Sequence, residues 1–165
     1  SVPSRREGGL MTDANITAGR ARTVALDTVK RYIGVPYRWG GDDPMAGFDC
    51  SGLAVELCKI GGALPRSADL SSRGLFQHFK DQGCEVDYPY AGCLVFFSSP
   101  GEPSRINHVE ICLDDTYTIG ASGGGDKTVT VEDAIQINAF VKVRPIKRDR
   151  PIVGYVDPFV GKLLV

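Results

Sequence analysis

The 165-residue sequence changes its hydrophobic period about halfway along, and this change constrains the fold more than any other feature. In "TAGRARTVALDTVKRYIG", residues 17–34, apolar residues recur at helical spacing until Gly34 ends the pattern. A second helical pattern follows Asp49 and stops at Gly61, and a third covers roughly residues 69–80. The first half therefore predicts three helices.

The second half consists of short segments rich in β-branched and aromatic residues, with turn residues between them. Such segments are typical of antiparallel strands. The expected strands cover residues 93–97, 108–113, 117–122, 127–131 and 139–146. Because the helices come first and the strands follow, we predict an α+β domain whose helices pack on a mostly antiparallel sheet of about five or six strands.

The length fits a single domain with its own core. Residues 1–13 begin with the polar stretch "SVPSRREGGL", and we interpret them as a tag or a disordered arm. Residues 14–165 are expected to form the domain. The last segment, "DRPIVGYVDPFVGKLLV", is either a docking segment or the final part of the fold.

Charge and composition argue against two classes of partner. The net charge is −1, which gives no electrostatic reason to expect nucleic acid, and no apolar run reaches the roughly 18 residues of a membrane helix. The sequence shows no secretory signal pattern, and its five cysteines are odd in number and irregularly spaced. We therefore expect synthesis in the cytoplasm, reduced thiols, and neither nucleic acid nor membrane as partner.

Cys50 lies in the first turn of the second predicted helix. Unpaired amides and the helix dipole favour a thiolate there and lower the pKa of the thiol. A buried cysteine also serves as a small apolar core residue, which is our interpretation of Cys58, Cys93 and Cys112. The residues beside Cys50 are polar or small, so that interpretation is weaker for Cys50.

A nucleophilic cysteine needs a base within hydrogen-bond reach, and the chain has two histidines. His78 lies on a polar helix face, whereas His108 opens an apolar strand after a loop. A single histidine on a strand is more often structural than catalytic. From these residues alone both roles remain open for His108.

Neither a metal site nor a cofactor is expected. No pair of cysteines or histidines has the C-x-x-C or H-x-x-x-H spacing of a metal site. The stretch "GASGGGDKT", residues 120–128, looks like a phosphate-binding loop, but Asp126 stands where that motif needs its lysine. A glycine-rich hairpin is the better interpretation of this stretch.

Several motifs occur together in one order. "VPYRWGGDDPMAGFDCSGL", "LPRSADLSSRG", "AGCLVFF" and "NHVEICLDDTYTIGAS" resemble the NlpC-type family of papain-like cysteine peptidases, which cut the stem peptides of bacterial cell walls. The resemblance extends from about Tyr32 to Ser122, and its most specific part is "PYRWGG" followed by "FDCSGL". It implies a papain-like fold.

The resemblance also implies a role for particular residues. Cys50 matches the nucleophile, His108 the base, and Tyr37 the residue beside the oxyanion site. Residues that match the substrate-binding positions, or are expected to contact the substrate beside them, are Asp49, Ser51, Ser67 and Trp39. Asp49 is also a good helix N-cap, and Ser67 would serve equally in a turn, so each has a structural alternative.

The implied reaction is hydrolysis of peptidoglycan stem peptides, commonly between the side-chain carboxyl of D-glutamate and the next diamino acid. The features of the chain fit a phage-encoded enzyme with a virion or tail partner. Two alternatives remain: a weakly active or inactive structural or binding module, such as a phage tail component, and an amidase or acyltransferase on the same scaffold.

One position departs from the resemblance. A third polar residue, usually histidine, is expected about a dozen residues after the base, but this position is Gly120. Glycine cannot orient an imidazole. The candidate substitutes are a water, a backbone carbonyl, or one of Asp114, Asp115, Ser122 and Asn138. A smaller departure is Cys93, where the family generally has aspartate.

Overall fold

The structure is a computed structural model that describes residues 13–45 and 47–160. The helices are α1 (Asp13–Lys30), α2 (Cys50–Ile60), α3 (Ser72–Asp81) and α4 (Val131–Ile137). The strands are β1 (Asp42–Asp43), β2 (Gly47–Phe48), β3 (Glu85–Val86), β4 (Leu94–Phe97), β5 (His108–Cys112), β6 (Tyr117–Ser122), β7 (Phe140–Pro145) and β8 (Ile152–Val156).

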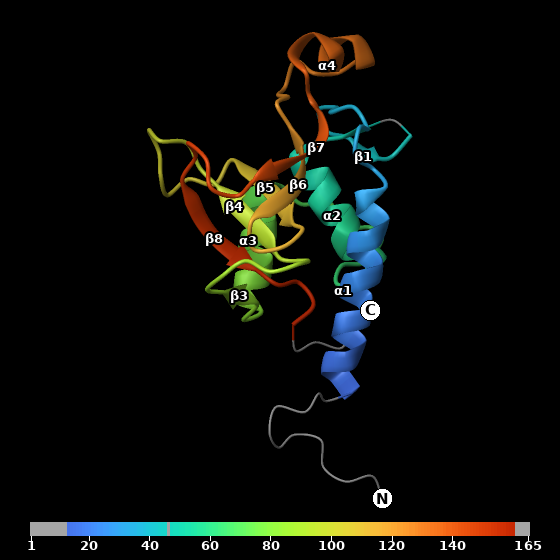
Figure 1. Ribbon diagram of the computed structural model, residues 1–165, viewed down its shortest axis with the longest axis vertical. Helices are drawn as coiled ribbons and strands as arrows, with labels where there is room; N and C mark the ends of the chain where they lie inside the picture. The colour runs from blue at the N-terminus through green and yellow to red at the C-terminus, as the bar shows by residue number, and fades with distance from the viewer. Residues whose placement is uncertain (1–12, 46, 161–165) are drawn as a thin grey trace, which may run out of the picture.

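Six of these strands form one sheet in the order β3-β8-β4-β5-β6-β7, and every neighbouring pair is antiparallel. The short strands β1 and β2 form a separate hairpin. Figure 1 shows α1 and α2 side by side next to this sheet, with α4 projecting from the end of β6 and β7. The predicted α+β architecture and its number of sheet strands are confirmed.

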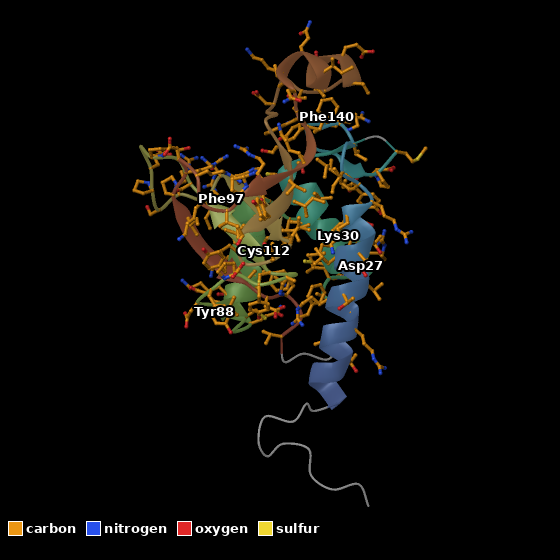
Figure 2. All side chains as sticks on the ribbon, in the orientation of Figure 1. Asp27, Lys30, Tyr88, Phe97, Cys112 and Phe140 are labelled. Atoms are coloured by element: carbon orange, nitrogen blue, oxygen red, sulfur yellow. The ribbon has the colours of Figure 1, made fainter. Side chains whose placement is uncertain are left out.

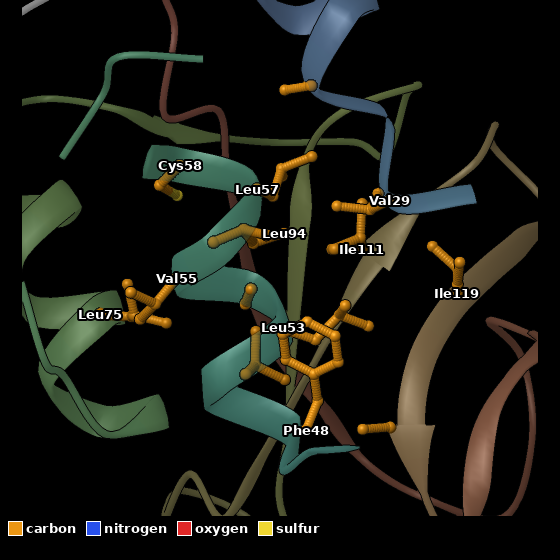
Figure 3. Packing of buried hydrophobic residues seen from close by; sticks show 14 of the residues in the cluster. Val29, Phe48, Leu53, Val55, Leu57, Cys58, Leu75, Leu94, Ile111 and Ile119 are labelled. Atoms are coloured by element: carbon orange, nitrogen blue, oxygen red, sulfur yellow. The ribbon is translucent and has the colours of Figure 1, made fainter. Parts of the chain in front are cut away.

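Helix α2 lies at the centre of the main core. It is apolar on most of its surface because it packs on α1, α3 and the strands β5 and β6. Figure 3 shows Val55 facing Leu75 of α3, and Leu53 on the same side as Phe48. Asp49 caps the helix by accepting a hydrogen bond from the amide of Gly52, as the sequence predicted.

The opposite face of the sheet carries a second, smaller apolar cluster. Val95 and Phe97 of β4 pack there with Cys93, Cys112 and Ile146. Figure 2 shows Phe97 and Cys112 over the sheet, apart from Asp27 and Lys30 on α1. The two cysteines are fully buried, as is Cys58 in the main core, so the interpretation of all three as core residues is confirmed.

The expected strand over residues 127–131 is wrong. Its alternation looks like a strand, but Thr130 and Asp133 form a capping box that starts α4 at Val131. The described part of the final segment, residues 149–160, belongs to the fold, because β8 lies between β3 and β4. Apart from Asp13, the first residue of α1, the expected arm lies outside the described residues. No helix in the described ranges has the length and apolarity needed to cross a membrane.

Candidate active site

A cleft opens where the N-terminus of α2 meets the sheet. Of the seven residues predicted as catalytic or substrate-binding, six line it: Tyr37, Trp39, Asp49, Cys50, Ser51 and His108. They come from the loop before α2, from the start of α2 and from the start of β5. Ser67 does not line this cleft; it is exposed in the segment between α2 and α3. His78 lies on α3, hydrogen-bonded to Gln82 and outside the cleft.

Two backbone amides lie within hydrogen-bond reach of the Cys50 thiol. Those of Ser51 and Val109 donate hydrogen bonds that favour the thiolate, which places the sulfur against the strand that carries His108. Burial and the charge of Asp49 nevertheless outweigh these amides and raise the pKa of the Cys50 thiol to about 11. The lowered pKa predicted from the helix position is therefore wrong: the resting thiol is neutral.

We expect this neutral thiol to be visible in its rate of alkylation by iodoacetamide. Because only the thiolate reacts, the rate at Cys50 should still be rising at pH 9 to 10, above the midpoint near 8.5 of a free thiol. Mass spectrometry of the alkylated peptides separates Cys50 from the four buried thiols. A plateau below pH 7 that disappears in His108→Ala would instead demonstrate a preformed ion pair.

His108 is held by a carboxylate on its own strand. Its Nε2 lies 2.6 Å from Oε2 of Glu110, and both side chains are buried. A carboxylate only accepts hydrogen bonds, so Nε2 carries the proton in the neutral imidazole and Nδ1 is left as the acceptor. Burial lowers the pKa of His108, against the opposing effect of Glu110. The resting imidazole is therefore a neutral base.

Gly120 leaves the space that Glu110 occupies. A Cβ atom added at Gly120 would lie 2.5 Å from Cγ of Glu110 and 2.8 Å from its Cδ. Any side chain at position 120 would therefore collide with the carboxylate unless Glu110 moved. The glycine at position 120 and the carboxylate at position 110 therefore depend on each other. The group that contacts the imidazole comes from β5, whereas the resemblance placed it on β6.

Glu110 is ionised because several donors surround it. Arg148 donates two hydrogen bonds to its oxygens, at 3.1 and 2.8 Å, and the Thr118 hydroxyl donates another. Burial alone would raise the pKa of Glu110, but the hydrogen bonds from His108 and Arg148 lower it to about 2. The Arg148 guanidinium lies over the Phe97 ring, 4.4 Å from its centroid.

The sequence analysis missed Glu110. None of the side chains it offered holds His108: Asp114 and Asp115 accept hydrogen bonds within the turn before β6, Ser122 accepts one from Arg144, and Asn138 ends α4. The usable signal was spacing, since residues two apart on a strand share a face. Glu110 is two residues from His108.

Tyr37 is a buried hydroxyl beside the candidate nucleophile. Burial, followed by the charges of Cys50 and Asp49, raises the pKa of Tyr37, so its hydroxyl keeps its proton at neutral pH. Gly124 packs directly on the ring, because a Cβ atom there would lie 2.2 Å from Cδ1 of Tyr37. The glycine-rich stretch considered as a phosphate loop therefore forms one wall of the cleft.

The helix side of the cleft is acidic. Asp49 and Asp69 line it, and both also line a smaller adjoining hollow with Asp42 and Ser51. Asp49 accepts hydrogen bonds from the Gly40 and Gly52 amides, so its capping role is present in addition to its place in the cleft. No group of three or more His, Cys, Asp or Glu residues that could hold a metal ion occurs within residues 13–45 and 47–160.

Residues 34–144 match the NlpC/P60 family. The gamma-DL-glutamyl hydrolase of Bacillus subtilis is 52% identical over 146 residues, covering 84% of this chain and 34% of that protein. The bifunctional muramidase/DL-endopeptidase CwlT of the same species is 36% identical over 104 residues, covering 62% and 30%. The chain thus spans about a third of the length of these relatives.

Solved structures share the fold. An NlpC/P60 family protein from Bacillus cereus superposes with a TM-score of 0.61 at 23% identity, over 82% of this chain and 39% of that one. This likeness confirms the predicted papain-like fold.

Proposed function

The chain belongs to the NlpC/P60 family, and from this premise we propose that it is a cysteine peptidase that hydrolyses the bond between the γ-carboxyl of D-glutamate and the following amine in peptidoglycan stem peptides. The observation that carries the proposal is the buried pair of His108 and Glu110 at a cleft that also holds Cys50. In this pair, Glu110 orients the neutral imidazole of His108, which can then accept the proton of the Cys50 thiol.

The first half of the reaction is acyl transfer to sulfur. As the Cys50 sulfur attacks the carbonyl carbon, its proton passes to Nδ1 of His108, and Glu110 stabilises the imidazolium that forms. The C–N bond then breaks, and His108 returns the proton to the leaving amine. Because both partners start neutral, the thiol needs its base at the moment of attack.

The second half hydrolyses the thioester. A water molecule gives a proton to His108 as its oxygen attacks the acyl carbon, and the Cys50 sulfur leaves and regains that proton. In both halves the negative charge on the carbonyl oxygen needs hydrogen-bond donors. The Tyr37 hydroxyl, which keeps its proton, and the amides at the start of α2 are the donors that we assign.

The choice of bond rests on the relatives. The relative that is 52% identical is a gamma-DL-glutamyl hydrolase, and another relative is a DL-endopeptidase. Asp49 and Asp69 suit the free amine at the end of a short stem peptide. A phage origin with a virion or tail partner is part of this proposal. Its alternatives are an inactive structural or binding module and an amidase or acyltransferase on the same scaffold.

The test uses the tripeptide L-alanyl-γ-D-glutamyl-L-lysine, with the products identified by mass spectrometry. We expect free lysine and L-alanyl-D-glutamate, and no products after Cys50 has been alkylated. A second reaction contains an added amine as a competing acceptor. Transfer to that amine in preference to water would favour the acyltransferase, and an unchanged tripeptide after long incubation would favour the inactive module.

A further inference from the structure

Two arginines give the sheet side of the cleft a positive charge. Arg144 of β7 and Arg150, in the segment between β7 and β8, line the same cleft as Cys50 and His108. Both come from the end of the chain, well after the motifs that identify the family. The matched family region ends at Arg144, and Arg150 lies beyond it.

The two guanidinium groups are fixed in place by neutral partners. Arg144 Nη1 donates to the Ser122 hydroxyl at 2.6 Å. Arg150 donates from Nη2 to the Asn107 side-chain oxygen at 2.6 Å and from Nε to the Ser98 carbonyl at 3.3 Å. A guanidinium has five N–H donors, so each arginine keeps donors for a ligand.

Neither charge is neutralised within the described part of the chain. Arg148 forms an ion pair with Glu110 and Arg22 forms one with Asp157, whereas no carboxylate of the described residues lies within ion-pair distance of Arg144 or Arg150. Burial, followed by the charge of Arg148, lowers the pKa of Arg150. A carboxylate from a substrate would provide the missing charge.

The acidic groups lie on the other side. The smaller hollow that shares Asp49, Ser51 and Asp69 with the cleft has no arginine among the described residues that line it. The cleft is therefore bipolar, with carboxylates at the helix side and guanidinium groups at the sheet side. A substrate with an amine at one end and a carboxylate near the reacting bond would match both.

We propose that Arg144 and Arg150 form an anion subsite that binds a carboxylate of the substrate next to the scissile bond, and that the protein prefers substrates in which this carboxylate is free over the same substrates as carboxamides. The proposal rests on the proposed function. Two carboxylates could occupy the subsite: the α-carboxylate of the D-glutamyl residue, or that of the amino acid that leaves.

Three peptides separate these sources: the tripeptide above, its form with the D-glutamyl α-carboxamide, and its form with a C-terminal carboxamide. We expect kcat/KM to fall about 10- to 100-fold for the form that lacks the bound carboxylate, as for loss of a hydrogen bond to a charged group. Arg150→Gln and Arg144→Gln should lose a similar factor with the free acid and little with that carboxamide.

Arg105→Gln is the matched control, because Arg105 is an exposed arginine outside the cleft and should retain wild-type values with all three peptides. Equal cleavage of the three peptides by the wild type would overturn the subsite, and so would equal losses with acid and amide in both cleft variants. If no peptide is cleaved, the proposed function fails. The subsite is then decided by the affinity of Cys50→Ala for acid and amide forms, measured by calorimetry, where equal affinities reject it.

Discussion

Cys50→Ala should lower kcat on the γ-D-glutamyl tripeptide by a factor on the order of 10⁶, the loss expected when a catalytic nucleophile is removed. The sulfur is the atom that bonds to the acyl group, and no other thiol lines the cleft. The fold should persist, because the side chain is only partly buried at the first position of α2. We would measure steady-state hydrolysis together with thermal unfolding.

Cys58→Ala provides the comparison for this variant. Cys58 lies two turns further along the same helix, is fully buried and does not line the cleft. Its replacement should reduce the stability by about 1 kcal/mol through the cavity left behind, while kcat stays near the wild-type value. If Cys50→Ala retained hydrolysis, the thiol would not be the nucleophile and the proposed mechanism would be wrong.

Glu110→Gln should lower kcat by about 10³- to 10⁴-fold, although the side chain keeps its size. A glutamine amide that donates to Nε2 favours the imidazole tautomer whose Nδ1 carries the proton, and that nitrogen then cannot accept the thiol proton. The carboxylate also raises the basicity of His108. The acid limb of kcat/KM should therefore move to lower pH in the residual activity of the variant.

This pH shift distinguishes an orienting role from a structural one, because simple loss of folded protein would scale the whole pH profile without moving it. Glu102→Gln is the control, since Glu102 is exposed, pairs with Arg105 and does not line the cleft. A sharper variant combines Glu110→Ala with Gly120→His, which frees the space at β5 and refills it from β6. Recovery of activity above that of Glu110→Ala would establish that the two positions are interchangeable.

The first three helices and the central strands were predictable because their signals are local. Asp49 indicated the start of α2, because aspartate is a good N-cap, and the apolar runs between residues 93 and 122 correspond to β4, β5 and β6. The strand β8 was not predictable in the same way, because it is defined by pairing with β3 and β4, far away in the sequence. Similarly, the strand expected at residues 127–131 was overridden by a capping box.

Site residues that belong to a sequence motif could be predicted, whereas a site residue that is placed by contacts between distant parts of the chain could not. Cys50, His108 and Tyr37 were identified from their motifs, and the structure brings them to one cleft. Glu110 was missed because a glutamate in an apolar strand is normally taken as a solvent-facing residue. Its burial depends on Arg148, which lies 38 residues away, and on Thr118 of the neighbouring strand.

Placing Glu110 on the same strand as His108 changes what keeps the pair aligned. When base and orienter come from neighbouring strands, their alignment depends on the pairing between those strands, and a slip of one residue would move the orienter to the other face of the sheet. Here both groups follow the pleat of β5 alone, two residues apart. An insertion in the turn between β5 and β6 should therefore leave the base correctly oriented as long as it keeps the register of β6, which places Gly120 beside Glu110 and supplies the Thr118 hydroxyl.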